Sequence, residues 1–154
     1  MDTLLVGKLS PRRRRAVALL GSAPLVGAAG FQVALARGAP HGDAVWGGRA
    51  PTVDGVLTPL YRVAAVGQGA VLVAMAWVVL GRGGLLDVPG LSPGALRRAT
   101  WGVAGFMALN TLSNLASPHP LERRMGAATA VVALASARLA AFSGSAEGVW
   151  TADR

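Results

Sequence analysis

The sequence predicts an all-α protein, a four-helix transmembrane bundle with both termini in the cytoplasm. Three observations support this fold class: an apolar composition, four apolar runs of membrane-spanning length, and an uneven distribution of arginines around these runs. The chain has 154 residues, of which 53% are hydrophobic and only 14% are charged. Ordinary soluble domains carry about 25% charged residues. The composition therefore favours a membrane protein.

The four apolar runs define the expected helices. A helix rises about 1.5 Å per residue and the bilayer core is about 30 Å thick, so a span needs roughly 17 to 25 mainly apolar residues. Because the four runs nearly exhaust the chain, residues 1–154 are expected to form a single integral membrane domain. The first run is too long for a signal-peptide core of roughly 7 to 15 residues and is expected to stay as a helix. The runs cover residues 16–36, 60–80, 99–116 and 125–144.

The basic residues that flank these runs predict the orientation. Cytoplasmic flanks of membrane proteins carry the excess of lysine and arginine. The basic residues here fall into a larger and a smaller group on the two sides of the membrane. The side with the larger group is expected to be the cytoplasmic side of a cell membrane, and residues 37–59 and 117–124 are expected to form outer loops on the other side. The arginine run 12–15 abuts an apolar stretch, which indicates contact with membrane lipids and not with nucleic acid. The larger group is Lys8, Arg12, Arg13, Arg14, Arg15, Arg82, Arg97, Arg98, Arg138 and Arg154, and the smaller is Arg37, Arg49, Arg62, Arg123 and Arg124.

Four amide side chains, Gln32, Gln68, Asn110 and Asn114, fall in the outer halves of the expected helices. An amide in hydrocarbon needs hydrogen-bond partners, so these side chains are expected to face the bundle interior or water. Two interpretations remain open. The amides either form interhelical hydrogen bonds that hold the packing, or they line a polar pocket that is open to the outside and admits a small ligand or a lipid headgroup.

The outer loops contain the remaining polar candidates. Two histidines and two carboxylates on one face could bind zinc, but no HxxxH or HExxH spacing exists, and a GxSxG nucleophile motif is also missing. We therefore expect no metal site, no cofactor and no catalytic residue. Trp46 is expected to anchor the loop at the membrane interface, and Glu122 to pair with adjacent arginines or to act as an acid at a helix N-terminus. The candidates are His41, Asp43, Trp46, Ser117, His119, Glu122 and Arg123.

Three segments, QVALARGAPHGDAVWGG, YRVAAVGQGAVLV and LNTLSNLASPHPLERRMG, carry a resemblance to a known group. Together they resemble short four-span bacterial integral membrane proteins of unknown function. In that group a Gly-Ala-Pro-x-Gly…Trp-Gly-Gly loop follows the first helix, and an Asn-Leu-x-Ser-x-x-x-x-Glu-Arg segment joins the third and fourth helices. The similarity covers most of the chain and implies no known activity. The matching positions are Gln32, Gly38, Ala39, Pro40, Gly42, Trp46, Gly47, Gly48, Arg62, Asn114, Ser117, Glu122 and Arg123.

This chain departs from the pattern in two places. His41 stands where the group usually has an aromatic residue, which places this histidine outside the motif and weakens the metal hypothesis. Met125 and Gly126 stand where an aromatic residue and Gly-Pro often begin the fourth helix.

These features predict a binding, sensing or accessory module with an outward-facing polar pocket. Its expected partners are membrane lipids, together with a second copy of the chain or another membrane protein. The alternative is a small transporter or channel subunit, which would need a polar path past Ser136 and Arg138; no aspartate or glutamate lies within a span to couple protons. A third hypothesis is an enzyme at the outer face that uses His41, Asp43 and Glu122 with His119.

Overall fold

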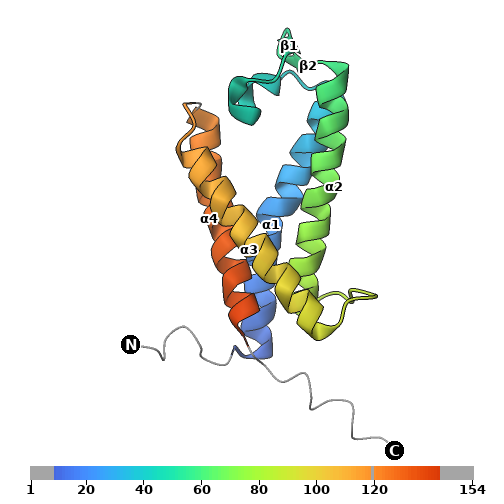
Figure 1. Cartoon of the computed structure of the whole chain (residues 1–154), viewed down its shortest axis with the longest axis vertical. Helices are drawn as coiled ribbons and strands as arrows, with labels where there is room; N and C mark the ends of the chain where they lie inside the picture. The colour runs from blue at the N-terminus through green and yellow to red at the C-terminus, as the bar shows by residue number, and fades with distance from the viewer. Residues whose placement is uncertain (1–8, 119, 143–154) are drawn as a thin grey trace, which may run out of the picture.

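The computed structural model describes residues 9–118 and 120–142, and it is all-helical, with 76% of the described residues in helices (Figure 1). The predicted all-α class is confirmed. The helices are α1 (Pro11–Ala36), α2 (Pro59–Arg82), α3 (Pro93–Leu115) and α4 (Pro120–Ala141).

Each of the four helices begins at a proline. Proline suits the first helical position, because its missing N–H would have no partner there. Ser10 and Ser92 cap α1 and α3 through their hydroxyls, which accept from the backbone amides of Arg13 and Ala95. The predicted starts at residues 16, 99 and 125 are therefore wrong by more than one turn. An apolar run identifies only the hydrophobic part of a helix, so a start predicted from it falls after a polar first turn.

Two of the described helices, α1 and α2, are long and apolar enough to cross a membrane. The sequence predicted four such spans, so the structure by itself supports half of them. Polar side chains account for the difference: Asn110 and Asn114 lower the hydropathy of α3, and α4 carries charged residues in both its first and last turns.

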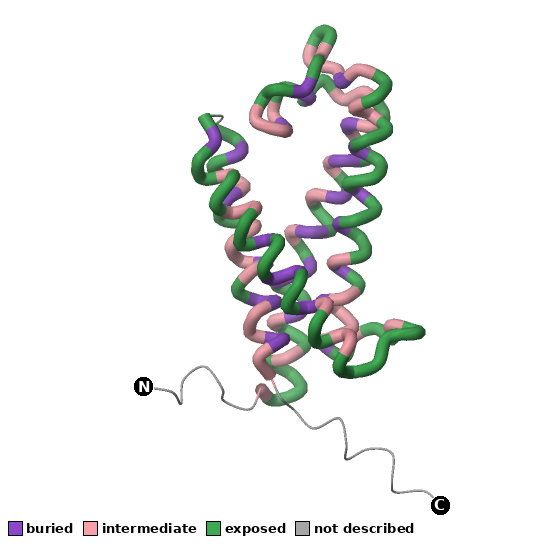
Figure 2. Tube along the Cα trace, viewed as in Figure 1, coloured by how far each residue is buried: buried purple, intermediate pink, exposed green. Residues whose placement is uncertain are grey.

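The helices form two arms that meet near the start of α1 and diverge toward the other end (Figure 1). Helix α1 packs along α2, α3 packs along α4, and the arms touch mainly through α1 and α4. At that crossing a Cβ on Gly21 would lie 2.9 Å from the Cβ of Ala135, so only glycine allows this approach. Buried residues follow the inner faces of the helices (Figure 2). The core of this half draws Leu25, Leu72, Val79, Met107, Val132 and Leu139 from all four helices.

A second, smaller core lies at the diverging end, where residues 37–58 fold against the α1/α2 arm. The segment contains two short 3-10 turns, Gly42–Ala44 and Trp46–Gly48, and a hairpin of β1 (Thr52–Val53) and β2 (Val56–Leu57). Asp54 and Gly55 both have positive φ, as a type I′ hairpin turn requires. This second core contains Leu35, Val45, Ala50, Leu57 and Ala65.

Arginines hold the opposite end of the molecule. Arg97 Nε donates to the carbonyl of Ala140 at 3.1 Å, and Arg82 donates to the carbonyl of Phe142. Arg14 Nε donates to the carbonyl of Gly83 at 3.2 Å. Cations next to carbonyls at helix C-termini also interact favourably with the helix dipole. These contacts fix the last turns of α2 and α4.

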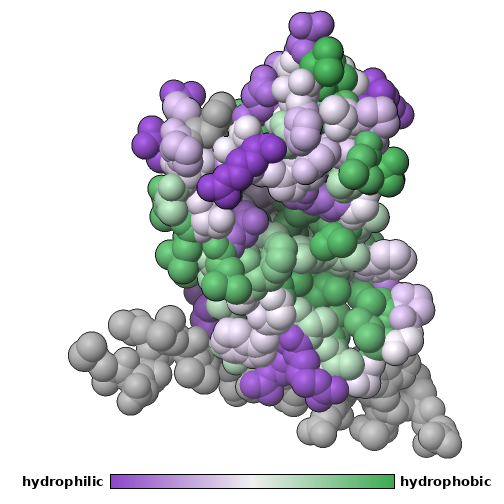
Figure 3. All heavy atoms as spheres, turned by 45° about the horizontal axis from the view of Figure 1, so that its top comes forward, coloured by the Kyte–Doolittle hydropathy of each residue, from purple (hydrophilic) through white to green (hydrophobic). Residues whose placement is uncertain are grey.

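Large apolar side chains are exposed on the outside of all four helices. Figure 3 shows hydrophobic residues around the middle of the visible face, with strongly hydrophilic residues toward its upper and lower parts. Leu109 is 69% exposed and Leu134 is 72% exposed, so this apolar surface includes α3 and α4. The others on the helices include Leu19, Leu20, Val26, Val33, Leu60, Val63, Val66, Val71, Val73, Trp77, Trp101, Phe106, Leu112, Leu115 and Leu121.

Candidate functional site

Gln32 is a buried polar side chain on the core-facing side of α1. It follows Leu25 and Ala29 at helical spacing, so it shares their face, and it lies between the larger core and the smaller core that begins at Leu35. Gln32 is only 5% exposed, and its Oε1 atom has no hydrogen-bond partner among the described residues. A buried acceptor without a donor costs about 1 to 3 kcal/mol. This atom is therefore suited to receive a donor from a bound molecule.

Asn110 and Asn114 form a hydrogen-bonded pair on α3. The Nδ2 of Asn114 donates to the Oδ1 of Asn110 at 3.0 Å. Asn114 also packs against α4, since a Cβ on Gly126 would lie 3.6 Å from its Cβ. No hydrogen bond in the described part of the chain joins either asparagine to Gln32.

A threonine pair links α3 to α4 nearby. Thr111 Oγ1 lies 2.9 Å from Thr129 Oγ1, and each hydroxyl is also within hydrogen-bond distance of a carbonyl of its own helix, so the two hydroxyl hydrogens are shared among three contacts. This threonine pair therefore contributes to the packing of α3 against α4, whereas the asparagine pair stays within α3.

The side chain of Gln68 is exposed on α2, and that it lines a pocket with the other three amides stays a prediction. The buried face of α2 is centred on Gly69 and Leu72, which pack toward α1 and the core. Gln68 lies at the edge of that face, and α2 has few contacts with α3 that could cover it.

The outer loop is fastened to the opposite arm through Glu122. The backbone amide of Gly47 donates to Glu122 Oε1 at 2.7 Å, and the hydroxyl of Ser117 donates to Oε2. Glu122 lies in the first turn of α4, as predicted, and is 8% exposed. Its described partners are this amide and this hydroxyl, in place of the predicted arginines. We call this contact the Glu122 clasp.

The backbone of the loop is shaped for the clasp. Trp46, Gly47 and Gly48 all have positive φ, so three consecutive residues adopt a left-handed conformation that turns the Gly47 amide toward α4. The Trp46 ring packs edge-on against Tyr61 of α2, with ring centroids 5.5 Å apart. Trp46 therefore fixes the loop to its own arm, and its role at a membrane interface stays a prediction.

The described residues that the enzyme hypothesis needs, His41, Asp43 and Glu122, each make contacts with other residues and not with one another. His41 is exposed and stacks on Phe31, and Asp43 accepts from the hydroxyl of Thr52 at 2.6 Å. Within the described residues no hydrogen bond connects His41 to Asp43 or Glu122, and no group of three or more metal-ligating side chains lies together. Arg123 is exposed on α4. His119 lies outside the described residues.

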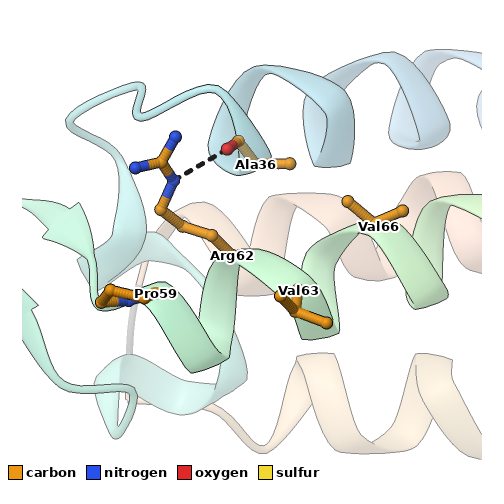
Figure 4. A pocket seen from close by; sticks show the side chains of 5 residues that line it. All are labelled: Ala36, Pro59, Arg62, Val63 and Val66. Carbon is orange, nitrogen blue, oxygen red and sulfur yellow. Dashed lines mark hydrogen bonds between the residues drawn. The ribbon is translucent and has the colours of Figure 1, made fainter.

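A groove that the sequence did not reveal runs between α1 and α2. Its volume is about 750 Å³, and a smaller hollow of about 260 Å³ adjoins it, sharing Ala36 and Val66. Arg37 lines the groove, and Arg62 lines the hollow (Figure 4). The Nε of Arg62 donates to the carbonyl of Ala36 at 2.8 Å, across the end of α1. In the sequence these arginines served only to predict membrane orientation. The groove could not be predicted there, because a groove depends on how the two helices pack.

No family model, curated protein or solved structure matches this chain. The resemblance to short four-span bacterial membrane proteins therefore stays a prediction.

Proposed function

We propose that this chain is a four-span integral membrane protein that acts as a binding module, taking a ligand with a hydrogen-bond donor between the outer halves of its two arms. The observation that carries the proposal is the buried Oε1 of Gln32, an acceptor with no partner among the described residues. A buried polar atom without a partner calls for an explanation, and a bound molecule that donates to it would relieve its cost.

Exposed apolar side chains support four membrane crossings. A soluble helical bundle keeps polar residues on its outer faces. Here Leu109 on α3 and Leu134 on α4 are more than two-thirds exposed, as are Leu60 and Val63 on α2. Hydrocarbon would cover this surface at low cost, including on the two helices whose composition alone does not meet the criterion for a span.

Charge supports the orientation with α1 beginning in the cytoplasm. The described residues place eight arginines and one aspartate at the end where α1 begins, and five arginines with three carboxylates at the end that bears the Glu122 clasp. The more positive end of a membrane protein faces the cytoplasm. The clasp and Gln32 then lie toward the outside.

The ligand chemistry follows from the residues around Gln32. Its carbonyl oxygen accepts a hydrogen bond from a hydroxyl, an amine or an amide, while the neighbouring Leu25, Ala29 and Leu35 offer only apolar contact. The ligand is therefore a mainly apolar molecule with a donor group. The Glu122 clasp limits how far the arms can separate around it.

The inner half of the molecule argues against a transport path. Residues from all four helices form an apolar core there, and Ser136 is fully buried within α4, although its Oγ, like the Oε1 of Gln32, has no hydrogen-bond partner among the described residues. A binding site open at one end fits this arrangement better than a channel.

Native mass spectrometry of the detergent-extracted protein tests the proposal. We expect the wild type to retain a small-molecule adduct that Gln32→Leu loses. Gln32→Leu should also be at least as thermally stable as the wild type, because it removes an unsatisfied acceptor. Gln68→Leu, on the exposed side of α2, is the matched control and should keep the adduct. A Gln32→Leu protein that keeps the adduct, or that loses stability without any change in bound mass, would contradict the proposal.

A further inference from the structure

We propose that the groove between α1 and α2 binds one anionic phospholipid, with its acyl chain along the groove and its phosphate between Arg37 and Arg62. This inference rests on the membrane location proposed above, but it concerns a site separate from Gln32, which does not line the groove.

The groove has a small-residue floor and apolar walls. Ala29 and Gly69 lie at its floor, where the two helices are in contact: a Cβ on Gly69 would lie 3.4 Å from the Cβ of Gln32 and 3.8 Å from the Ala29 carbonyl oxygen. Exposed valines, among them Val33 and Val66, form the walls. Its volume of about 750 Å³ lies within the roughly 300 to 1,000 Å³ range of ligand sites. A hydrocarbon chain suits such a lining, because the walls offer only apolar contact.

The length of the groove matches one leaflet of a bilayer. Its lining extends from Val26 to Arg37 on α1, a distance of about 16 Å at a rise of about 1.5 Å per residue. Half of a hydrocarbon core of about 30 Å is about 15 Å. An acyl chain that begins at the arginines would therefore end near the bilayer midplane, at the level of Val26.

Two cationic side chains stand at the polar end of the groove without a carboxylate. Neither Arg37 nor Arg62 forms an ion pair with any described residue. Arg62 uses its Nε for the carbonyl of Ala36, which holds the guanidinium in place, and none of its terminal nitrogens has a hydrogen bond within the described chain (Figure 4). Paired guanidinium groups bind phosphate oxygens through charge-assisted hydrogen bonds. The charge and the apolar groove together select an anionic phospholipid over a second copy of the chain, whose helix would leave both cations uncompensated.

The chain offers matched substitutions to test this site. A Cβ on Gly30 would meet no atom within 4 Å, so Gly30→Leu fills the groove without disturbing the fold. Gly27 has the same open surroundings on the same helix but does not line the groove, so Gly27→Leu is its control. Ala70→Leu fills the groove from α2. For the charge, Arg37→Gln with Arg62→Gln removes both cations, and Arg49→Gln is a control from the same end of the molecule.

The experiment titrates delipidated protein in neutral detergent with phosphatidylglycerol or phosphatidylcholine of identical acyl chains and counts adducts by native mass spectrometry. We expect one phosphatidylglycerol per chain, bound about tenfold or more tightly than phosphatidylcholine, since hydrogen bonds to charged groups are worth about that factor. Gly30→Leu and Ala70→Leu should lose both lipids, the double glutamine variant should lose only the preference, and both controls should bind like the wild type.

Three results would overturn the proposal. The first is a wild-type protein that binds no phosphatidylglycerol, and the second is a phosphatidylglycerol adduct that Gly30→Leu leaves unchanged. The third is a wild-type dimer that Gly30→Leu converts to a monomer, because this result would assign the groove to a second copy of the chain. An alkaline wash of cell membranes separates this failure from that of the proposed function. A protein released by the wash contradicts both proposals, whereas a retained protein whose lipid binding ignores Gly30→Leu contradicts only the lipid site.

Discussion

The carboxylate of Glu122 accepts a hydrogen bond from the backbone amide of Gly47 at 2.7 Å, although the two residues are 75 positions apart in sequence. This bond joins the loop of the α1/α2 arm to the first turn of α4, at the end where the arms diverge. Among the described residues, no other side-chain hydrogen bond joins the two arms at that end, so we expect this bond to help set the spacing of the arms there.

Glu122→Ala should lower the free energy of unfolding by about 1.5 to 3 kcal/mol, because a buried carboxylate loses two hydrogen bonds and leaves the Gly47 amide unpaired. Thermal unfolding in detergent measures the change. Asp87→Asn alters an exposed carboxylate at the opposite end and should leave the stability within about 0.5 kcal/mol of the wild type. Equal stability of the two variants would mean that the clasp contributes nothing.

Gly21→Ala should destabilise the crossing of α1 and α4 by about 1 to 3 kcal/mol, because its new Cβ would lie 2.9 Å from the Cβ of Ala135. Gly27→Ala adds the same methyl group on the same helix in open space, and should stabilise the protein by up to about 1 kcal/mol through helix propensity. The comparison uses thermal unfolding midpoints under one detergent condition. If both variants shift in the same direction, the crossing is looser than described.

Arg97→Gln should loosen the last turn of α4 and cost about 0.3 to 2 kcal/mol, because the donor to the Ala140 carbonyl and a cation at the helix C-terminus are lost together. Hydrogen exchange of the amides near the end of α4 is the direct readout. Arg98→Gln changes an exposed neighbour with no described hydrogen bond and should leave that exchange unaltered. Faster exchange in both variants would assign the effect to net charge.

Thr111→Val should weaken the contact of α3 with α4 by about 0.6 to 2 kcal/mol, since it removes the hydroxyl bond to Thr129 while keeping the side-chain volume. Thr100 bonds only to the carbonyl of its own helix in the described chain, so Thr100→Val is a control that keeps the interhelical contacts. Double variants with Thr129→Val should show that the two threonine effects are not additive. Additive effects would mean that the hydroxyls act independently.

The sequence predicted the helices but not their arrangement. Apolar runs identify segments that avoid water, and the proline at each helix start explains why α1, α3 and α4 begin earlier than these runs. The Asp54-Gly55 pair is a hairpin signal that was present in the sequence and missed, although both residues adopt the required positive φ. Local chemistry of this kind can be read from neighbouring residues.

The candidate site was only partly predictable because it depends on contacts between distant segments. Gln32 and Gln68 are the same residue type in the outer halves of two expected helices, yet one is buried and the other is exposed, since only helix packing decides which side is covered. The partner of Glu122 is a backbone amide, which has no sequence signature. The groove between α1 and α2 likewise depends on how the two helices pack, with Ala29 and Gly69 at its floor.

The central claim is that the chain crosses the membrane four times with the Glu122 clasp outside. Thiol labelling of single-cysteine variants in intact cells tests this claim most directly, because the chain contains no cysteine of its own. Val53→Cys, Asp87→Cys and Pro118→Cys place exposed thiols in the three segments between helices. With a membrane-impermeant reagent, the account predicts labelling at positions 53 and 118 in intact cells and at position 87 only after permeabilisation. Protection of position 118 would leave two crossings in place of four, and labelling of position 87 in intact cells would reverse the orientation.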